Sequence, residues 1–536
     1  MMSSSSSNQE EQQRTVSEYR ILALYRFIPL VTPQTNQTTT TQESWDEQTI
    51  MKHPERHPQL LQLQSELYAT LRRYETRGTL LIAPEGINGT ICYPYPPPTA
   101  VGNDVDDGNN VGEYDKEADP VKSFISNHPL FGGEGLRTRS SVWKEHQTHD
   151  DCDNTNNNNN KNSRSDSITS DTTTTQQTNN NRPQQAFQRL KIKIKPEIVT
   201  LGLGRPITQN PTTHTPTPTQ QQRHTYNQLA NPNITKGTYL NPKQWDDAMK
   251  DPNVLVIDTR NSYEIDIGSF ESAVDPRTRH FSEFPEYLER LAGEYDWSQR
   301  DQEQQQDDDE MKVQNCNGDG NGSNEMSRNE QQPIKKKAPP TAIAMFCTGG
   351  IRCEKATSYA LQSNLFPQNL PIYHLEGGIL SYLDDVAKRE TQEEQEGEGS
   401  SSTFHGECFV FDKRVALTEG LEPSNKYISC HGCRGPMDRR LLDEVEDGAT
   451  NYDAGNGTSD LEKKRKEYEQ LLMGIRNLPP LTYDSNSQRW YVPGLTCPRC
   501  HDGTTRESFE RFAQRKEQME ICAREGKSHF QDNGRK

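Results

Sequence analysis

The stretch AMFCTGGIRCEKATSYAL, residues 344–361, decides the fold that we expect for the centre of the chain. The apolar run 341–347 ends on Cys347 and is typical of a buried strand. A glycine pair follows and allows a tight turn, and the segment 354–366 has the pattern of a helix. Cys347 is therefore predicted at the carboxyl end of a strand, where open α/β folds usually place their sites.

The segments on both sides continue this alternation of strands and helices. Residues 253–270 read as a buried strand followed by an acidic turn, and residues 371–383 as a strand and a turn into a helix. Residues 284–295 read as a helix, and Asn241 or a neighbouring residue is placed to cap another one. Such alternation predicts a parallel α/β sheet with flanking helices over residues 237–390. A polar insert near 300–338 interrupts it.

The loop after Cys347 can stabilise a thiolate. Backbone N–H groups, the start of a helix and the guanidinium of Arg352 would all lower the pKa of Cys347 and would also hold an anion. The loop itself consists of Thr348, Gly349, Gly350 and Ile351. Arg352 follows Cys347 by five positions, so the loop is one residue shorter than the C-x5-R loop of cysteine phosphatases, which disfavours phosphatase chemistry.

Cys353 leaves two interpretations open. It lies where the helix begins and could resolve an oxidised Cys347, or it could be a small buried residue. The second interpretation is the simpler one, since free cysteine is often buried.

An α+β unit is predicted before the parallel sheet, over residues 18–202. A strand, a helix, two short strands and a second helix lead to the alternating stretch RLKIKIKPEIVTLG, residues 189–202. With that stretch as its last strand, the order β-α-β-β-α-β matches a ferredoxin-like or acylphosphatase-like domain. Almost no apolar residues occur in several segments, which we expect to be disordered: the tail 1–17, inserts near 94–118 and 145–185, the linker 203–236 and the insert 300–338.

One strand of this unit has a basic face. Alternation places Leu190, Ile192 and Ile194 on one side and four cations on the other: Arg189, Lys191, Lys193 and Lys195. Such a face suits contacts with RNA phosphates, which position RNA without reading its sequence. An ordinary solvated face is the alternative.

The last block, residues 404–536, contains two C-x2-C pairs: Cys430 with Cys433, and Cys497 with Cys500. Two such pairs can complete a tetrahedral site for structural zinc, without help from the neighbouring His431 and His501. Unpaired thiols or a redox pair are the alternatives.

Four stretches together carry a family resemblance: APEGINGT (83–90), RLKIKIKPEIVTLG (189–202), CTGGIRCEKA (347–356) and GECFVFDKRVA (406–416). The third resembles the active loop of rhodanese domains. All four together resemble the tRNA wobble-uridine hydroxylases, which use oxygen to form 5-hydroxyuridine.

The resemblance implies roles for several residues. Cys347 would be the family's persulfide-forming cysteine, with Arg352 beside it, and Asp258 and Arg260 would support the loop as part of a DTR turn. It also implies tRNA as partner, held by its anticodon arm, and O2 as co-substrate. No flavin, nicotinamide, haem or iron signature is apparent.

The expected function is therefore that of a tRNA-modifying enzyme in three parts. Two alternatives remain: a thiosulfate-type sulfurtransferase that uses the same Cys347 loop, and a non-catalytic rhodanese scaffold that binds RNA or protein. An intact Cys347 disfavours the scaffold.

Composition sets outer limits on these functions. The formal net charge of −18 gives no reason to expect DNA binding or nonspecific nucleic-acid binding. No apolar run is long enough to span a membrane, and the first residues lack an apolar signal region. Eleven cysteines, an odd number, favour thiol or metal chemistry over a disulfide framework. We therefore expect a cytoplasmic protein.

Overall fold

A computed structural model describes most of the chain outside its polar segments. The described residues are 18–31, 57–95, 119–144, 187, 189–203, 230–297, 336–393, 402–442, 459–476 and 478–524. The tail, inserts and linker that the sequence predicts to be disordered lie almost entirely outside these ranges. None of the described helices is long and apolar enough to cross a membrane.

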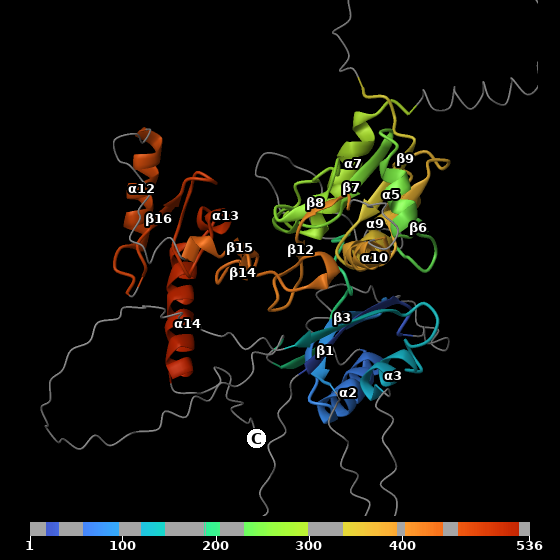
Figure 1. Cartoon of the computed structure of the whole chain (residues 1–536), viewed down its shortest axis with the longest axis horizontal. Coiled ribbons are helices and arrows are strands. Elements are labelled where there is room, and N and C mark those ends of the chain that lie inside the picture. The colour runs from blue at the N-terminus through green and yellow to red at the C-terminus, as the bar shows by residue number, and fades with distance from the viewer. Residues whose placement is uncertain are drawn as a thin grey trace, which may run out of the picture.

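The N-terminal part forms a five-stranded sheet with two helices on one face (Figure 1). Its elements are β1 (Glu18–Phe27), α2 (Pro58–Arg73), β2 (Arg77–Ala83), β3 (Gly86–Pro94), α3 (Pro120–Ser126), β4 (Arg137–Lys144) and β5 (Leu190–Ile194). Leucines spaced three and four apart along α2, from Leu60 to Leu71, pack with Ile87 and Ile91 of β3 in one core. The opposite face of the sheet is thereby left for other contacts.

One strand assignment made from the sequence is wrong. The strand order is β4-β1-β3-β2-β5, so β4 completes the ferredoxin-like unit, antiparallel to β1. β5, which the sequence analysis assigns to that place, is a fifth strand at the other edge, parallel to β2. β4 has no strand signal in the sequence, because none of its described side chains is buried and RTRSSVWK has no apolar alternation.

The central part is the predicted parallel sheet, with strand order β6-β10-β9-β7. Its elements are β6 (Thr238–Leu240), α5 (Pro242–Met249), β7 (Val254–Asp258), α6 (Ser262–Ile265), β8 (Gly268–Phe270), α7 (Phe284–Glu294), β9 (Ala342–Phe346), α9 (Ile351–Gln362), β10 (Ile372–Leu375) and α10 (Gly378–Glu393). Asn241 caps α5 with a full capping box, as expected.

Two cores lie on the two faces of this sheet. Alternate residues of β9 divide between them: Ile343 and Met345 join the core of α7 and α9, whereas Ala344 and Phe346 join the core of α5 and α10. A sheet covered on both faces explains the unbroken apolar run of β9.

The remaining elements follow in the C-terminal part. They are β11 (Phe404–Gly406), β12 (Cys408–Phe409), β13 (Ala416–Leu417), the short helix η3 (Glu419–Leu421), β14 (Tyr427–Ser429), β15 (Pro436–Asp438), α12 (Ser459–Leu472), β16 (Thr482–Asp484), β17 (Arg489–Tyr491), α13 (Pro498–His501) and α14 (Arg506–Arg524). β11 pairs with β8, and Phe404 and Cys408 enter the core of α5 and α10. The segment 404–421 is thus packed against the parallel sheet.

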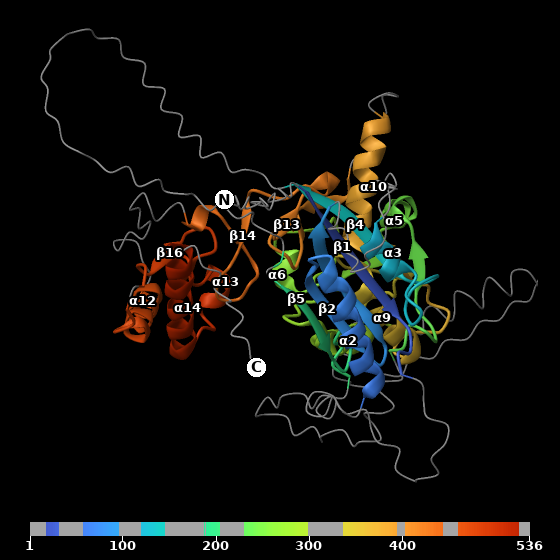
Figure 2. The same cartoon turned by 90° about the horizontal axis from the view of Figure 1, so that it is seen from below.

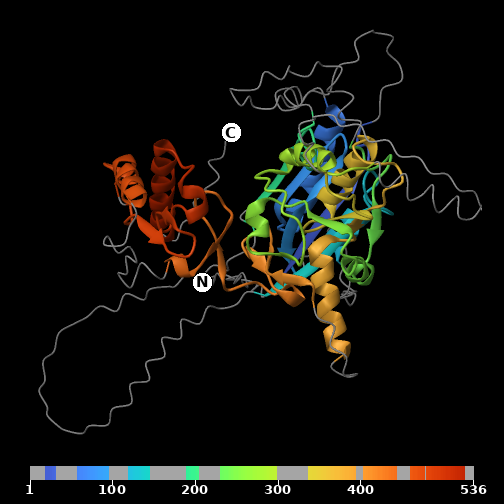
Figure 3. The same ribbon diagram turned by 90° about the horizontal axis from the view of Figure 1, so that it is seen from above.

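The open face of the N-terminal sheet lies against the parallel-sheet part (Figures 2 and 3). Tyr25, Phe27 and Ala83 of that face cluster with Ile198, and Ile351 of α9 packs against them. This contact between the two sheets positions the site described next.

Candidate active site

The Cys347 loop lies between β9 and α9, as the sequence predicts. Gly350 precedes the helix with φ +95, a left-handed conformation that favours glycine. Its backbone N–H donates to Cys347 Sγ over 3.0 Å. A Cβ atom at this position would also lie 3.0 Å from the Tyr25 hydroxyl, so glycine is required both by the turn and by the neighbouring sheet.

A second glycine turn holds the loop from the other side. Gly377 and Gly378 both have positive φ and lead into α10. The first amides of that helix donate to the loop carbonyls, from Ile379 to Cys347 over 2.9 Å and from Leu380 to Thr348 over 3.1 Å. A Cβ atom on Gly378 would meet the Cys347 carbonyl at 2.4 Å. The loop is therefore fixed by the N-termini of two helices.

The environment of Cys347 favours its thiolate. Burial raises its pKa, but a hydrogen bond from the Cys353 thiol, the charge of Arg352 and backbone N–H groups outweigh burial and lower the pKa of Cys347 to about 6. The side chain is only 1% exposed, yet it lies in the wall of a cleft. A thiolate of this kind is the nucleophilic form of cysteine near neutral pH.

Arg352 is held by a partner that the sequence analysis did not single out. Its guanidinium makes two contacts with the buried carboxylate of Glu264 on α6, Nη1 to Oε1 at 2.9 Å and Nη2 to Oε2 at 3.0 Å. This fork geometry fixes the arginine beside the loop. Nothing in the spacing of residues 264 and 352 could have revealed the pair.

Cys353 is fully buried, as expected from the simpler of the two interpretations, that of a small buried residue. Its Sγ lies 3.6 Å from Thr259 Oγ1, and burial together with Cys347 raises its pKa. This environment favours the protonated form of Cys353, which can then donate to the Cys347 thiolate.

Asp258 and Arg260 form a fully buried ion pair at 2.7 Å. Arg260 also donates to the Gly268 carbonyl, and Ser269 donates to Asp258, so the pair ties β7 to β8. Between them, Thr259 donates its backbone N–H and its hydroxyl to the Phe346 carbonyl, directly before Cys347. The turn thus supports the strand that carries the cysteine.

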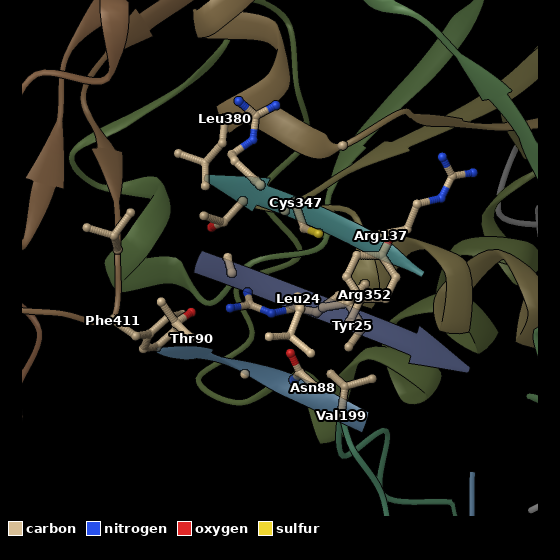
Figure 4. A pocket seen from close by; sticks show the side chains of 18 of the residues that line it. Leu24, Tyr25, Asn88, Thr90, Arg137, Val199, Cys347, Arg352, Leu380 and Phe411 are labelled. Atoms are coloured by element: carbon tan, nitrogen blue, oxygen red, sulfur yellow. The ribbon is translucent and has the colours of Figure 1, made fainter. Parts of the chain in front are cut away.

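A cleft of about 700 Å³ opens between the two sheets at Cys347 (Figure 4). Its walls come from β1, β3, β4, the tail of β5, the Cys347 loop, the start of α10 and the segment 410–421. The charged side chains among the lining residues are Arg137, Arg139, Lys195, Arg352 and Arg414 on the cationic side and Glu197, Glu376 and Asp412 on the acidic side, and the other polar and aromatic ones include Tyr25, Asn88, Thr90, Phe187 and Phe411. All four sequence stretches that carry the family resemblance reach this one space.

Lys355 joins three of those stretches. Its ammonium group contacts Glu85 at 2.9 Å and Glu197 at 2.5 Å and donates to the Val199 carbonyl over 2.9 Å. The preceding residue, Glu354, accepts hydrogen bonds from Tyr25 and Tyr239. The helix that starts at the Cys347 loop is thereby attached to the N-terminal sheet by two adjacent charged residues.

Comparisons with known proteins assign this arrangement to a family. The chain is 32% identical to the tRNA uridine(34) hydroxylase of Teredinibacter turnerae over 350 residues, which are 65% of this chain and 69% of the relative. This chain belongs to the tRNA uridine(34) hydroxylase family. A family model described as a UPF0176 acylphosphatase-like domain also matches residues 56–198.

Among the solved structures that match is a protein of unknown function from Rhodopseudomonas palustris, described as a possible tyrosine phosphatase. It shares 17% identity and covers 32% of this chain and 96% of its own, with a TM-score of 0.16. A score this low supports no conclusion about fold or function.

In this member of the tRNA uridine(34) hydroxylase family, the four cations of residues 189–195 do not have the same surroundings. Ile192 is buried beneath α2, whereas Arg189 and Lys193 are exposed. Lys195, at the end of the strand, lines the cleft. The burial of Lys191 and its cationic neighbours Arg189 and Lys193 lower the pKa of Lys191.

The four C-terminal cysteines converge, as their spacing predicts. Their sulfur atoms all lie within 4.8 Å of one another, with Cys430 to Cys500 and Cys433 to Cys497 both at 3.8 Å. His431 packs edge-on against Phe512, and His501 is hydrogen-bonded to Thr496, so neither joins the cluster. The four residues form a candidate metal site.

Proposed function

We propose that this chain hydroxylates the wobble uridine of tRNA to 5-hydroxyuridine, with O2 as co-substrate, and that Cys347 in its rhodanese-like loop is the reactive centre. Membership of the tRNA uridine(34) hydroxylase family supports the reaction. The observation that carries the assignment to Cys347 is its position, with a lowered pKa, in a cleft built by all four family-like stretches.

The size and charge of the cleft support a nucleotide as its occupant. A volume of about 700 Å³ lies within the range of small-molecule sites. Arg137, Arg139 and Lys195 line it. Arg137 pairs with Glu376 at 2.9 Å and Arg139 with Asp384 at 3.6 Å, and both ion pairs are partly exposed, so phosphates on either side of an extruded base could still contact these cations. An anticodon loop offers bases that are already unstacked, so no duplex has to open.

The N-terminal and C-terminal parts are proposed to hold the anticodon arm, and the parallel sheet, residues 237–390, to act as the rhodanese-like catalytic domain. Arg189, Lys191 and Lys193 would extend the cationic surface beyond Lys195 along the edge of the N-terminal sheet. Like-charged neighbours at this edge are stabilised by a polyanion, which supports the proposal. A tRNA substrate is consistent with a cytoplasmic location.

Zinc is the proposed occupant of the C-terminal cysteine cluster. Tetrahedral zinc with sulfur ligands at about 2.3 Å requires sulfur–sulfur separations of about 3.8 Å. Three of the six sulfur–sulfur separations are 3.7 to 3.8 Å, all six lie within 4.8 Å, and the ligands are all thiols, a set that fits zinc. An ion at Cys430, Cys433, Cys497 and Cys500 would hold two chain segments together and leave no coordination position open, so its role is structural.

The test is incubation of the purified full chain with unmodified tRNA under air, followed by nucleoside mass analysis. A gain of one oxygen on uridine is expected, and Cys347→Ser should reduce it by on the order of 10³-fold or more while tRNA is still bound. Cys92→Ser is the matched control, because Cys92 is buried in the N-terminal sheet and burial raises its pKa to about 12.

Other outcomes would contradict the proposal. Release of sulfur from thiosulfate without any RNA product would identify a sulfurtransferase. Retention of tRNA with neither product would identify a binding scaffold.

A further inference from the structure

We propose that Asn88 recognises the target base as uracil by accepting a hydrogen bond from its N3–H group. The inference rests on the proposed function, because it takes a base of RNA as the occupant of the cleft. It concerns the GINGT part of the stretch 83–90, whose side chains have no role in holding the thiolate.

The register of β3 directs Asn88 into the cleft. Ile87 and Ile91 of this central strand pack beneath the helices of the N-terminal sheet. Side chains alternate along a strand, so Asn88 and Thr90 point to the other face, which lines the cleft. Figure 4 shows both residues on the cleft wall below Cys347, with the side-chain oxygen of Asn88 directed toward that side.

The orientation of the Asn88 amide is fixed by a hydrogen bond to the tail of β5. Nδ2 donates to the backbone carbonyl of Ile198 over 2.9 Å. A carbonyl can only accept, so the amide cannot turn over without losing this bond. Oδ1 is therefore the atom that Asn88 offers to a ligand, and it is an acceptor.

An acceptor at this place distinguishes the two pyrimidines. Uracil carries a hydrogen on N3 and donates it, whereas N3 of cytosine is itself an acceptor. Uracil would pair with Oδ1, and cytosine would leave two acceptors facing each other without a proton. A site built to bond a substrate N–H rejects an analogue that lacks it, because its own polar group is left unpaired.

The segment that carries the Ile198 carbonyl, the partner of Asn88, is linked to α9. The Ile198 backbone N–H donates to Glu85 Oε1 over 2.7 Å, and Glu85 is paired with Lys355 of α9. The side chain of Ile198 is buried at the contact between the sheets. The proposed reading group is thus held in a constant position relative to Cys347, which a reaction at one carbon atom of the base requires.

An aromatic side chain at the cleft offers a surface for the face of the base. Phe411 is 63% exposed, unusual for phenylalanine, and it lines the cleft with its ring 5.0 Å edge-on from Phe409. Aromatic rings stack on bases of any sequence. Phe411 would hold a base without selecting it, which leaves the selection to Asn88.

The test is a binding measurement with the full chain under nitrogen, where no oxygen-dependent product forms. Anticodon stem-loop RNAs are compared that differ only at position 34, carrying uridine, cytidine or 3-methyluridine. The wild type should bind the uridine RNA at least about tenfold more tightly than either other RNA, and Asn88→Ala should bring all three affinities to within about twofold.

Gln64→Ala is the matched control. Gln64 Nε2 also donates to a carbonyl of the β5 segment, that of Ile192, over 2.8 Å, but from the helix side of the sheet. This variant should keep the wild-type preference for uridine.

Two results would overturn the inference: a wild type that binds the three RNAs equally, or an Asn88→Ala variant that keeps the preference. The 3-methyluridine RNA tests the same bond in wild-type protein, so the answer does not depend on the variant folding. If the wild type prefers uridine but makes no hydroxylated product under air, the proposed function fails and the reading role of Asn88 stands. Absence of RNA binding would overturn both.

Discussion

The Cys347 loop and the C-terminal cysteine cluster both depend on sulfur atoms, but they hold them in opposite ways. Around Cys347, backbone N–H groups, Arg352 and the Cys353 thiol stabilise one thiolate at the edge of a cleft. In the C-terminal part, four sulfur atoms lie within 4.8 Å of one another and could hold a metal ion between them. The first site stabilises its thiolate with protein groups alone; in the second, all four sulfurs are placed to act as ligands of one ion.

Removal of the metal should have the largest effect and should act on one site only. A structural zinc site contributes on the order of 10 kcal/mol to the fold around it. Treatment with a chelator, or Cys497→Ser, should therefore make the C-terminal part sensitive to protease, with release of about one zinc ion per chain. Alkylation of Cys347 should continue at its original rate. Loss of Cys347 reactivity together with the metal would show that the two sites are not independent.

Breaking the attachment of α9, the helix after Cys347, to the N-terminal sheet should give the next largest effect. Lys355→Met keeps the length of the side chain but leaves Glu85 and Glu197 without their shared cation, a loss of about 3–5 kcal/mol. The measurement is denaturant unfolding of the full chain. Lys388→Met serves as control, since the ion pair of Lys388 with Asp384 is largely exposed and should change stability by less than about 0.5 kcal/mol. Equal effects of the two substitutions would contradict the role given to Lys355.

The adjacent Gly349 and Gly350 distinguish the cost of backbone strain from that of an added methyl group. Gly350→Ala should destabilise the protein by about 1–2 kcal/mol, because its φ of +95 suits only glycine and the Tyr25 hydroxyl lies 3.0 Å from the added Cβ. Gly349→Ala should be almost neutral, since a Cβ atom there meets nothing within 4 Å. Thermal unfolding of both variants measures the difference, and a loss at residue 349 as large as at residue 350 would disprove this geometry.

The smallest expected effect is a shift in the pH dependence of Cys347. Iodoacetamide reacts with the thiolate, so its rate should rise with pH, reach half of its maximum near pH 6 and level off above pH 7. Cys353→Ala removes a hydrogen bond to the thiolate and should move the midpoint upward by about one unit. Cys353→Ser keeps a donor and should move it less. An unchanged midpoint in Cys353→Ala would leave Arg352 and the backbone as the only causes.

The sequence predicts those features that depend on residues close together in the chain. The strand before Cys347, the glycine turn and the start of α9 follow from adjacent residues, and the convergence of four cysteines follows from two C-x2-C spacings. Glu264, by contrast, reaches Arg352 across 88 positions, and Glu85 reaches Lys355 across 270. Such partners are fixed by the tertiary fold, and their sequence surroundings carry no sign of it.

The same distinction explains the misplaced strand. α2 covers one face of β5, and the side chains on that face are apolar. Apolar and charged residues therefore alternate clearly along residues 189–195. β4 is an edge strand whose described side chains are all at least partly exposed, and it contributes Arg137 and Arg139 to the cleft. Strands that supply function without supplying core leave little periodic signal in the sequence.

The cleft has walls from two separate sheets, and this ties its existence to their docking. Either sheet alone would keep its own core but would lack part of the cleft walls; Lys355 would lose its contact with Glu85, and Tyr25 its contact with Glu354. A nascent chain that has made only its N-terminal sheet does not yet contain Cys347, and a chain whose sheets fail to dock lacks the cleft wall that β1, β3 and β4 supply. Substitutions in the N-terminal sheet can therefore abolish activity although they leave the residues of the Cys347 loop unchanged.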